Sequence, residues 1–212
     1  MSAPVVKICG VTLPEHAQAA ADAGAAMVGL VFVPGSPRAI DRAAAERILE
    51  ALPAHVEPVA LLADADERHP VLAWWRGRVQ LHGNEDEAAC ARVAAAGFRV
   101  MKGFAYSPAE AARWDACAAV DTLVVDGPRG GGGVAFDHAA LAAQMPALRT
   151  RVLLAGGLSP ATVRAAIDRV HPWGVDVSSG VERTRGVKDA DLIRAFCAAA
   201  GVTTPRGPRH GP

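Results

Sequence analysis

The fold of this chain is decided by two stretches near its C-terminus, Val152-Leu153-Leu154-Ala155-Gly156-Gly157-Leu158-Ser159-Pro160 and Gly174-Val175-Asp176-Val177-Ser178-Ser179-Gly180-Val181-Glu182, with one helix-like segment between them. In each stretch a short apolar run ends in small residues, which let the backbone approach an anion and direct N–H groups at it near a helix start. Two such turns, late in a chain, indicate the phosphate site that parallel barrels build after strands seven and eight. The alternative is a pair of tight turns that use Gly and Ser for geometry alone.

The composition fits a soluble α/β protein. Of the 212 residues 51% are hydrophobic, enough to bury the core of one large domain or two small ones. Lys plus Arg and Asp plus Glu number 22 each. No broad charge therefore attracts nucleic acid or an anionic membrane, and an anionic ligand must be held locally. Because the N-terminus lacks an apolar signal region and no apolar run is long enough to span a membrane, we predict a cytoplasmic protein.

A strand followed by a helix recurs eight times along the chain. The expected strands are residues 5–10, 27–33, 57–63, 78–82, 98–104, 122–126, 151–155 and 174–178. The expected helices are residues 14–23, 41–52 (capped by Asp41), 70–76, 86–96, 108–117, 137–148, 160–170 and 189–200. Strands too apolar to face water imply a parallel sheet covered by helices, and eight is the number that closes a barrel. A doubly wound open sheet is the alternative, but its G-x-G-x-x-G fingerprint is absent after the first strand. We predict a single (β/α)8 barrel of the TIM type over residues 1–200 and a disordered tail over 201–212.

Polar side chains gather at the carboxyl ends of the expected strands, the rim where barrels carry their functional groups. Alternation along each strand places the following pairs on one face: Lys7 with Cys9, Gln80 with His82, Val124 with Asp126, and Asp176 with Ser178. Burying unpaired polar groups costs a few kcal/mol each, so such a ring indicates a site. The alternative, strongest for Gln80, His82 and Asp176, is a hydrogen-bonded network that closes the barrel.

Three residues stand where they could act on a ligand. Cys9 ends its strand at Gly10, where a thiolate could be a base or nucleophile, although a lone Cys is usually inert packing. The other cysteines (Cys90, Cys117, Cys197) lie in Ala-rich helical segments, and none of the four has metal-site spacing, so we predict no metal.

Asp126 precedes a glycine-rich loop at 127–133 and follows apolar residues that favour the protonated acid, which suits a general acid. The loop could also be a linker without contacts. Arg38 could hold a carboxylate or phosphate, or it could be a solvated surface residue.

Several stretches together resemble the phosphoribosylanthranilate isomerase family of tryptophan biosynthesis. The matching stretches are Lys7-Ile8-Cys9-Gly10, Ser36-Pro37-Arg38, Gln80-Leu81-His82-Gly83, Asp126 with the glycine-rich loop and Phe136-Asp137, Leu154-Ala155-Gly156-Gly157-Leu158, and Val175 to Glu182 with Gly186-Val187-Lys188-Asp189. They follow the family's order over nearly the whole chain. The departures are Leu61-Leu62-Ala63-Asp64, Val134-Ala135 and His138, none of which removes a catalytic group.

The resemblance implies the Amadori rearrangement of N-(5-phosphoribosyl)anthranilate to 1-(2-carboxyphenylamino)-1-deoxyribulose 5-phosphate, without a cofactor. Cys9 is then the base, Asp126 the acid, and Arg38 the ligand of the anthranilate carboxylate. Backbone around Gly156, Gly157, Ser179 and Gly180 is expected to hold the phosphate, and Gln80, His82, Asp176 and Ser178 to line the substrate.

Two other functions stay open at this point. A related isomerase of histidine biosynthesis uses two aspartates, one of them at the position of Cys9, and a phosphosugar-binding barrel without catalysis would not need both Cys9 and Asp126. The expected partner is a small phosphorylated substrate, with no nucleic acid or membrane, and the chain is expected to be a monomer or homodimer.

Overall fold

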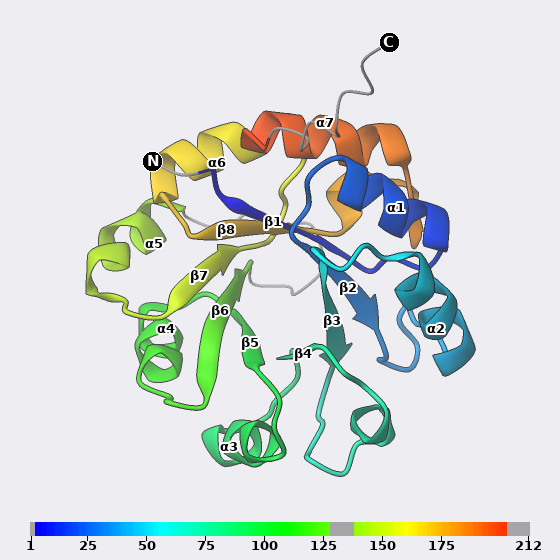
Figure 1. Ribbon diagram of the computed structural model, residues 1–212. Coiled ribbons are helices and arrows are strands. Elements are labelled where there is room, and N and C mark those ends of the chain that lie inside the picture. Colours follow the sequence, from blue (N-terminus) through cyan, green and yellow to red (C-terminus); the bar gives the residue numbers. More distant parts are fainter. Residues whose placement is uncertain (1–2, 128–137, 203–212) are drawn as a thin grey trace.

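The computed structural model describes residues 3–127 and 138–202 and contains a closed barrel of eight parallel strands (Figure 1). Neighbouring strands follow one another in chain order, and the barrel closes where β1 pairs with β8. The predicted (β/α)8 barrel is therefore confirmed. The strands are β1 (Val5–Cys9), β2 (Met27–Val31), β3 (Glu57–Leu62), β4 (Arg78–Leu81), β5 (Val100–Ala105), β6 (Val120–Asp126), β7 (Arg151–Leu154) and β8 (Gly174–Val177).

Helices lie around the outside of the strands (Figure 1). They are α1 (Pro14–Asp22), α2 (Arg42–Ala51), α3 (Glu87–Ala95), α4 (Pro108–Asp115), α5 (His138–Gln144) with the 3-10 turn η2 (Met145–Ala147), α6 (Val163–Val170) and α7 (Ala190–Ala200). Side chains cap several of them, since Asp41 accepts the N–H of Ala44 at 2.8 Å as predicted, and Asp86 accepts that of Ala89 at 2.8 Å. The helix expected from residue 160 begins only at Val163.

The helix predicted over residues 70–76 is wrong. Only a short 3-10 turn, η1 (Pro70–Ala73), forms there. The rings of Trp74 and Trp75 then pack edge to face with centroids 5.8 Å apart. The indole N–H of Trp75 donates to the carbonyl oxygen of Arg78 at 2.9 Å, which fixes the entry into β4. Trp75 is buried in the hydrophobic core, and Trp74 packs against that core.

The core has two layers. A large layer lies between the strands and the helices, and a smaller one fills the barrel itself. The buried side chains of the inner layer are Met27, Val59, Met101, Val124, Leu153 and Ala155. Polar side chains are buried inside the barrel as well, from the middle of the strands to their carboxyl ends: Lys7, Gln80, Asp126 and Asp176.

A small hairpin after β8 was not predicted. The 3-10 turn η3 (Ser179–Val181) leads into β9 (Glu182–Thr184), which pairs antiparallel with β10 (Val187–Lys188). Gly186, at the bend, has a φ of +87°, and a Cβ there would lie 2.4 Å from the carbonyl oxygen of Pro37. Only glycine therefore lets the hairpin pack on the loop after β2, where Arg38 lies.

Three predictions fall outside the described residues. They concern residues 128–133 of the glycine-rich loop predicted over 127–133, the matched pair Phe136-Asp137, and residues 203–212 of the tail predicted over 201–212. Within the ranges 3–127 and 138–202, no helix has the length and apolar character needed to cross a membrane.

Candidate active site

A cavity of about 480 Å³ opens at the carboxyl ends of the barrel strands. Its size lies within the ordinary range for small-molecule sites. The predicted residues on its wall are Cys9, Arg38, Gln80, His82, Asp126, Gly156, Gly157, Asp176, Ser178 and Ser179. Gly180 is the one predicted residue that lies off the wall. The fold therefore brings together side chains and turns from six different strand ends.

Cys9 ends β1 on the inner face of the barrel and is 5% exposed. Its partner on β2 is Gly29, where a Cβ would lie 2.9 Å from the sulfur, so glycine makes room for the thiol. Burial raises the pKa of Cys9, and the nearby ammonium of Lys7 opposes burial without outweighing it. At neutral pH the thiol is therefore favoured over the thiolate.

Asp126 ends β6 and is also 5% exposed. The backbone N–H of Gly127 donates to its Oδ1 at 2.7 Å, and Nε2 of His82 lies 3.8 Å from its Oδ2. Gly156 packs directly against this carboxyl group, since a Cβ there would lie 2.7 Å from Oδ1. The acid is thus held from three sides at the cavity wall.

Gln80 and His82 contact each other, with 2.9 Å between Gln80 Nε2 and His82 Nδ1. Gly103 on β5 leaves room for the imidazole, because a Cβ there would lie 1.9 Å from Nδ1. Burial lowers the pKa of His82, and the nearby carboxylate of Asp126 only partly opposes this, so the ring is neutral at neutral pH. These two residues form the internal contact that the sequence left as an alternative, and they also line the cavity.

Arg38 is held by Glu182 rather than solvated. Arg38 Nε donates to Glu182 Oε1 at 2.6 Å, and Nη2 donates to Oε2 at 2.9 Å. Lys188, which is fully buried, donates to the same carboxylate at 2.8 Å and to the carbonyl and hydroxyl oxygens of Ser178 at 2.9 and 3.1 Å. Because a guanidinium has five N–H donors and Glu182 uses two, Arg38 keeps donors for a ligand in the cavity.

The predicted anion-binding turns lie next to each other. Gly156 and Gly157 follow β7 with φ values of +81° and +66°, the left-handed region that favours glycine. A Cβ on Gly180 would lie 1.9 Å from the carbonyl oxygen of Leu158, so η3 packs directly on the turn after β7. Ser179, the first residue of η3, shares the cavity wall with both glycines.

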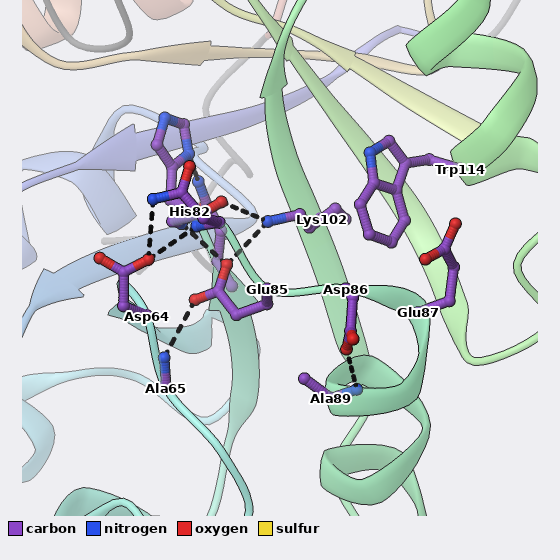
Figure 2. A network of polar contacts seen from close by, with 12 residues as sticks. Asp64, Ala65, His82, Glu85, Asp86, Glu87, Ala89, Lys102 and Trp114 are labelled. Carbon is purple, nitrogen blue, oxygen red and sulfur yellow. Dashed lines mark hydrogen bonds and ion pairs between the residues drawn. The ribbon is translucent and has the colours of Figure 1, made fainter.

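A buried ion pair between Lys102 and Glu85 holds the turn after β4 in place (Figure 2). Lys102 Nζ donates to Glu85 Oε2 and to the carbonyl oxygen of Gly83, both at 2.7 Å. Glu85 in turn accepts the N–H groups of Gly83 at 2.9 Å and of Ala65 at 3.3 Å. The pair ties the turns after β3 and β4 together directly beyond His82.

Sequence reasoning gave no role to several of these residues. For Lys7, the available signal in the sequence was its position as a charged residue inside an apolar strand. Glu182 and Lys188 lie in stretches that match the family, but the sequence did not show that Glu182 binds Arg38, and nothing in the local pattern pointed to Glu85. No group of three or more His, Cys, Asp or Glu side chains in the described parts of the chain is arranged to hold a metal ion.

The fold and the site together define a (β/α)8 barrel with a small-molecule cavity, in which a carboxyl group and a thiol lie beside turns suited to an anion. Comparison with known proteins makes the assignment narrower. The family model described as N-(5'phosphoribosyl)anthranilate (PRA) isomerase matches residues 6–199. The chain therefore belongs to the N-(5'-phosphoribosyl)anthranilate isomerase family, as its resemblance to that family indicated.

Individual relatives align with this chain over almost their full length. The N-(5'-phosphoribosyl)anthranilate isomerase of Afipia carboxidovorans is 43% identical, and the alignment covers 95% of this chain and 92% of that protein. A solved phosphoribosyl anthranilate isomerase in complex with reduced 1-(o-carboxyphenylamino)-1-deoxyribulose 5-phosphate is 34% identical, with a TM-score of 0.83 and coverage of 93% and 98%. A structure of monomers of the dimeric enzyme from Thermotoga maritima is also 34% identical, with a TM-score of 0.82 and the same coverage.

Proposed function

We propose that this chain catalyses the Amadori rearrangement of N-(5-phosphoribosyl)anthranilate, with Asp126 as general acid and Cys9 as general base. The observation that carries the proposal is that both groups, from β6 and β1, face one cavity together with Arg38 and the turns after β7 and β8. Membership in an isomerase family and the ligand of the solved relative support the choice of substrate.

The acid step belongs to Asp126. Its carboxyl group gives a proton to the ring oxygen of the sugar as the bond from that oxygen to C1 breaks, which yields a Schiff base between C1 and nitrogen. The N–H of Gly127 and the neutral His82 fix the orientation of the carboxyl group. A neutral imidazole suits this place, because it does not compel Asp126 to ionise as a nearby cation would.

The base step belongs to Cys9. Its thiolate takes the proton from C2, the C2–H electrons form a C1–C2 double bond, and the C1–N double-bond electrons pass to nitrogen. The enolamine then tautomerises to the ketone, as C1 gains a proton and the C2 hydroxyl loses one. C1 is reduced as C2 is oxidised, so the rearrangement consumes no oxidant or reductant and needs no redox cofactor.

Binding is assigned to the remaining wall of the cavity. Arg38, oriented by Glu182, holds the anthranilate carboxylate. The N–H groups of Gly156, Gly157 and Ser179 hold the phosphate, as glycine-rich turns in such barrels do, and Gly180, which lies off the wall, lets η3 pack on the turn after β7. Gln80, His82, Asp176 and Ser178 line the sugar.

A turnover assay of the full chain with three ligands tests the function. We expect isomerisation of N-(5-phosphoribosyl)anthranilate and little or none of the aminoaldose of histidine biosynthesis, because Cys9 occupies the position of that enzyme's second aspartate. Binding of the product analogue without turnover would instead favour a phosphosugar-binding barrel. Loss of binding as well would remove the proposed substrate altogether.

The location and association state of the chain stay predictions. We propose a cytoplasmic protein that is a monomer or a homodimer, the second being supported by the dimeric relative from Thermotoga maritima. Light scattering on a size-exclusion column distinguishes the two states, and fractionation of cells that make the protein tests its location.

A further inference from the structure

Lys7 is a buried charge that the proposed mechanism does not use. It lies on β1 with its side chain inside the barrel, fully shielded from solvent. In the β1–β8 pairing Lys7 stands opposite Asp176, and its Nζ donates to Asp176 Oδ1 at 2.9 Å. A lysine at the centre of a barrel needs a specific partner, because isolated buried charges are strongly unfavourable.

The ammonium group has a second partner, the thiol of Cys9. The two residues are two positions apart on one strand, so both side chains point into the barrel. The charge of Lys7 favours the thiolate of Cys9, and an ionised Cys9 in turn favours the ammonium of Lys7. A Cβ on Gly29 would lie 2.9 Å from the sulfur and 3.3 Å from Lys7 Nζ, so the glycine of β2 leaves room for both groups at once.

We propose that Lys7 is a positioning residue that stabilises the thiolate of Cys9, and that Asp176 holds the ammonium group in place for this. The inference rests on the proposed role of Cys9 as base. When the thiolate takes the substrate proton, a neutral thiol is left beside the Lys7–Asp176 pair. The thiolate is the form that gains from the ammonium, so Lys7 favours the state that begins the proton transfer.

The charges that face Cys9 come from several elements. Lys7 acts from β1, Asp176 from β8 and Lys188 from β10, and Arg38, His82 and Asp126 line the same cavity. Burial raises the pKa of Cys9 most, and Asp176 raises it further. Lys7 lowers the pKa more than any other charge, and Lys188 lowers it by less. Burial also acts to lower the pKa of Lys7, but Asp176 and Cys9 outweigh it and the net direction is upward, which favours the ammonium form of Lys7.

The test compares Lys7→Met with the unchanged chain, without substrate. Thiolate formation is followed by ultraviolet absorbance against pH, and the same protein carrying Cys9→Ser is subtracted to isolate Cys9. We expect the Cys9 titration to move upward by at least about one pH unit, and alkylation of Cys9 by iodoacetamide at neutral pH to slow by about tenfold or more. An unchanged titration and alkylation rate would overturn the inference.

Lys102→Met is the matched control. Lys102 is another buried lysine paired with a buried carboxylate, that of Glu85, but it is not among the largest influences on the pKa of Cys9. We expect a similar loss of stability and no shift of the Cys9 titration. An equal shift in both variants would mean that Lys7 acts only through the general packing of the barrel, and would refute the positioning role.

A second variant covers the case in which Lys7→Met leaves Asp176 unpaired and fails to fold. Lys7→Met with Asp176→Asn removes both charges, and a smaller upward shift is still expected, because Lys7 influences Cys9 more than Asp176 does. No shift in that double variant would refute the inference. Since these titrations need no substrate, an enzyme that shows the shift but fails to turn over N-(5-phosphoribosyl)anthranilate refutes the proposed function alone.

Discussion

The carboxylate of Glu182 offers a quantitative test of how the site is built. Its side chain is 4% exposed and accepts two hydrogen bonds from Arg38, one from Lys188 at 2.8 Å and one from the N–H of Gly186 at 3.1 Å. Glu182→Gln keeps the volume and removes the negative charge. Two buried or half-buried cations then lose their shared partner.

The size of the effect follows from proton linkage. Burial by itself would raise the pKa of Glu182, but the hydrogen bonds from Arg38, Lys188 and Gly186 outweigh it and lower the pKa from 4.5 to about 2. Each pKa unit corresponds to about 1.4 kcal/mol, so the carboxylate contributes roughly 3 kcal/mol to stability. Because the folded pKa is the lower one, this contribution is complete above about pH 4.5 and is lost as the pH falls through about 2.

The assay is urea unfolding followed by tryptophan fluorescence, since Trp75 and Trp114 are buried. At neutral pH we expect Glu182→Gln to lower the free energy of unfolding by roughly 3 kcal/mol, and the gap to the unchanged chain to close towards about pH 2. Glu87→Gln is the control. The pKa of Glu87 is also lowered to about 2, mainly by Arg113, but its side chain is 45% exposed and screened by water, so its loss should be small.

Two results would refute this reasoning. One is an equal loss of stability in Glu182→Gln and Glu87→Gln at neutral pH, which would mean that burial of the carboxylate is irrelevant. The other is a gap between Glu182→Gln and the unchanged chain that stays constant down to about pH 2. Either would show that Glu182 does not anchor Arg38 and Lys188 as an ion.

Three further predictions concern catalysis. Cys9→Ser should nearly abolish turnover while the far-ultraviolet circular dichroism is unchanged, because the swap is close to isosteric; a kcat like that of the unchanged chain would remove Cys9 from the mechanism. Arg38→Ala should lower kcat/KM by about tenfold or more, since a charged hydrogen bond is worth on the order of 1.5–3 kcal/mol, and no change would mean that the carboxylate binds elsewhere. The pH profile of kcat/KM should be bell-shaped, because the proposed mechanism needs protonated Asp126 together with ionised Cys9, and the population of that state passes through a maximum between the two macroscopic pKa values. Asp126→Asn should lose most activity and the descending limb; if it kept both, His82 would be the next candidate for the acid.

The fold was predictable because its signals are local and repeated. Apolar strands recur eight times, an α-helix follows each of them except β3, and each repeat could be recognised without its neighbours. The failure at residues 70–76 has a physical cause, because Trp74 and Trp75 fit a helical pattern locally but pack against the barrel through contacts that periodicity does not encode. The β9–β10 hairpin was missed because it depends on the fit of Gly186 against Pro37, two distant parts of the chain.

In the candidate site, too, the local features were predictable from the sequence and the long-range contacts were not. By itself the sequence determined which residues end the strands, since alternation and strand order place Cys9, Asp126 and the glycines of the turn after β7 on one rim. Only the tertiary structure decided which charges face one another: Lys7 with Asp176 through the closure of the barrel, and Arg38 with Glu182 through the hairpin. The reason is that strand periodicity acts over a few residues, whereas an ion pair requires two atoms within hydrogen-bond distance, and these partners are separated by 169 and 144 positions along the chain.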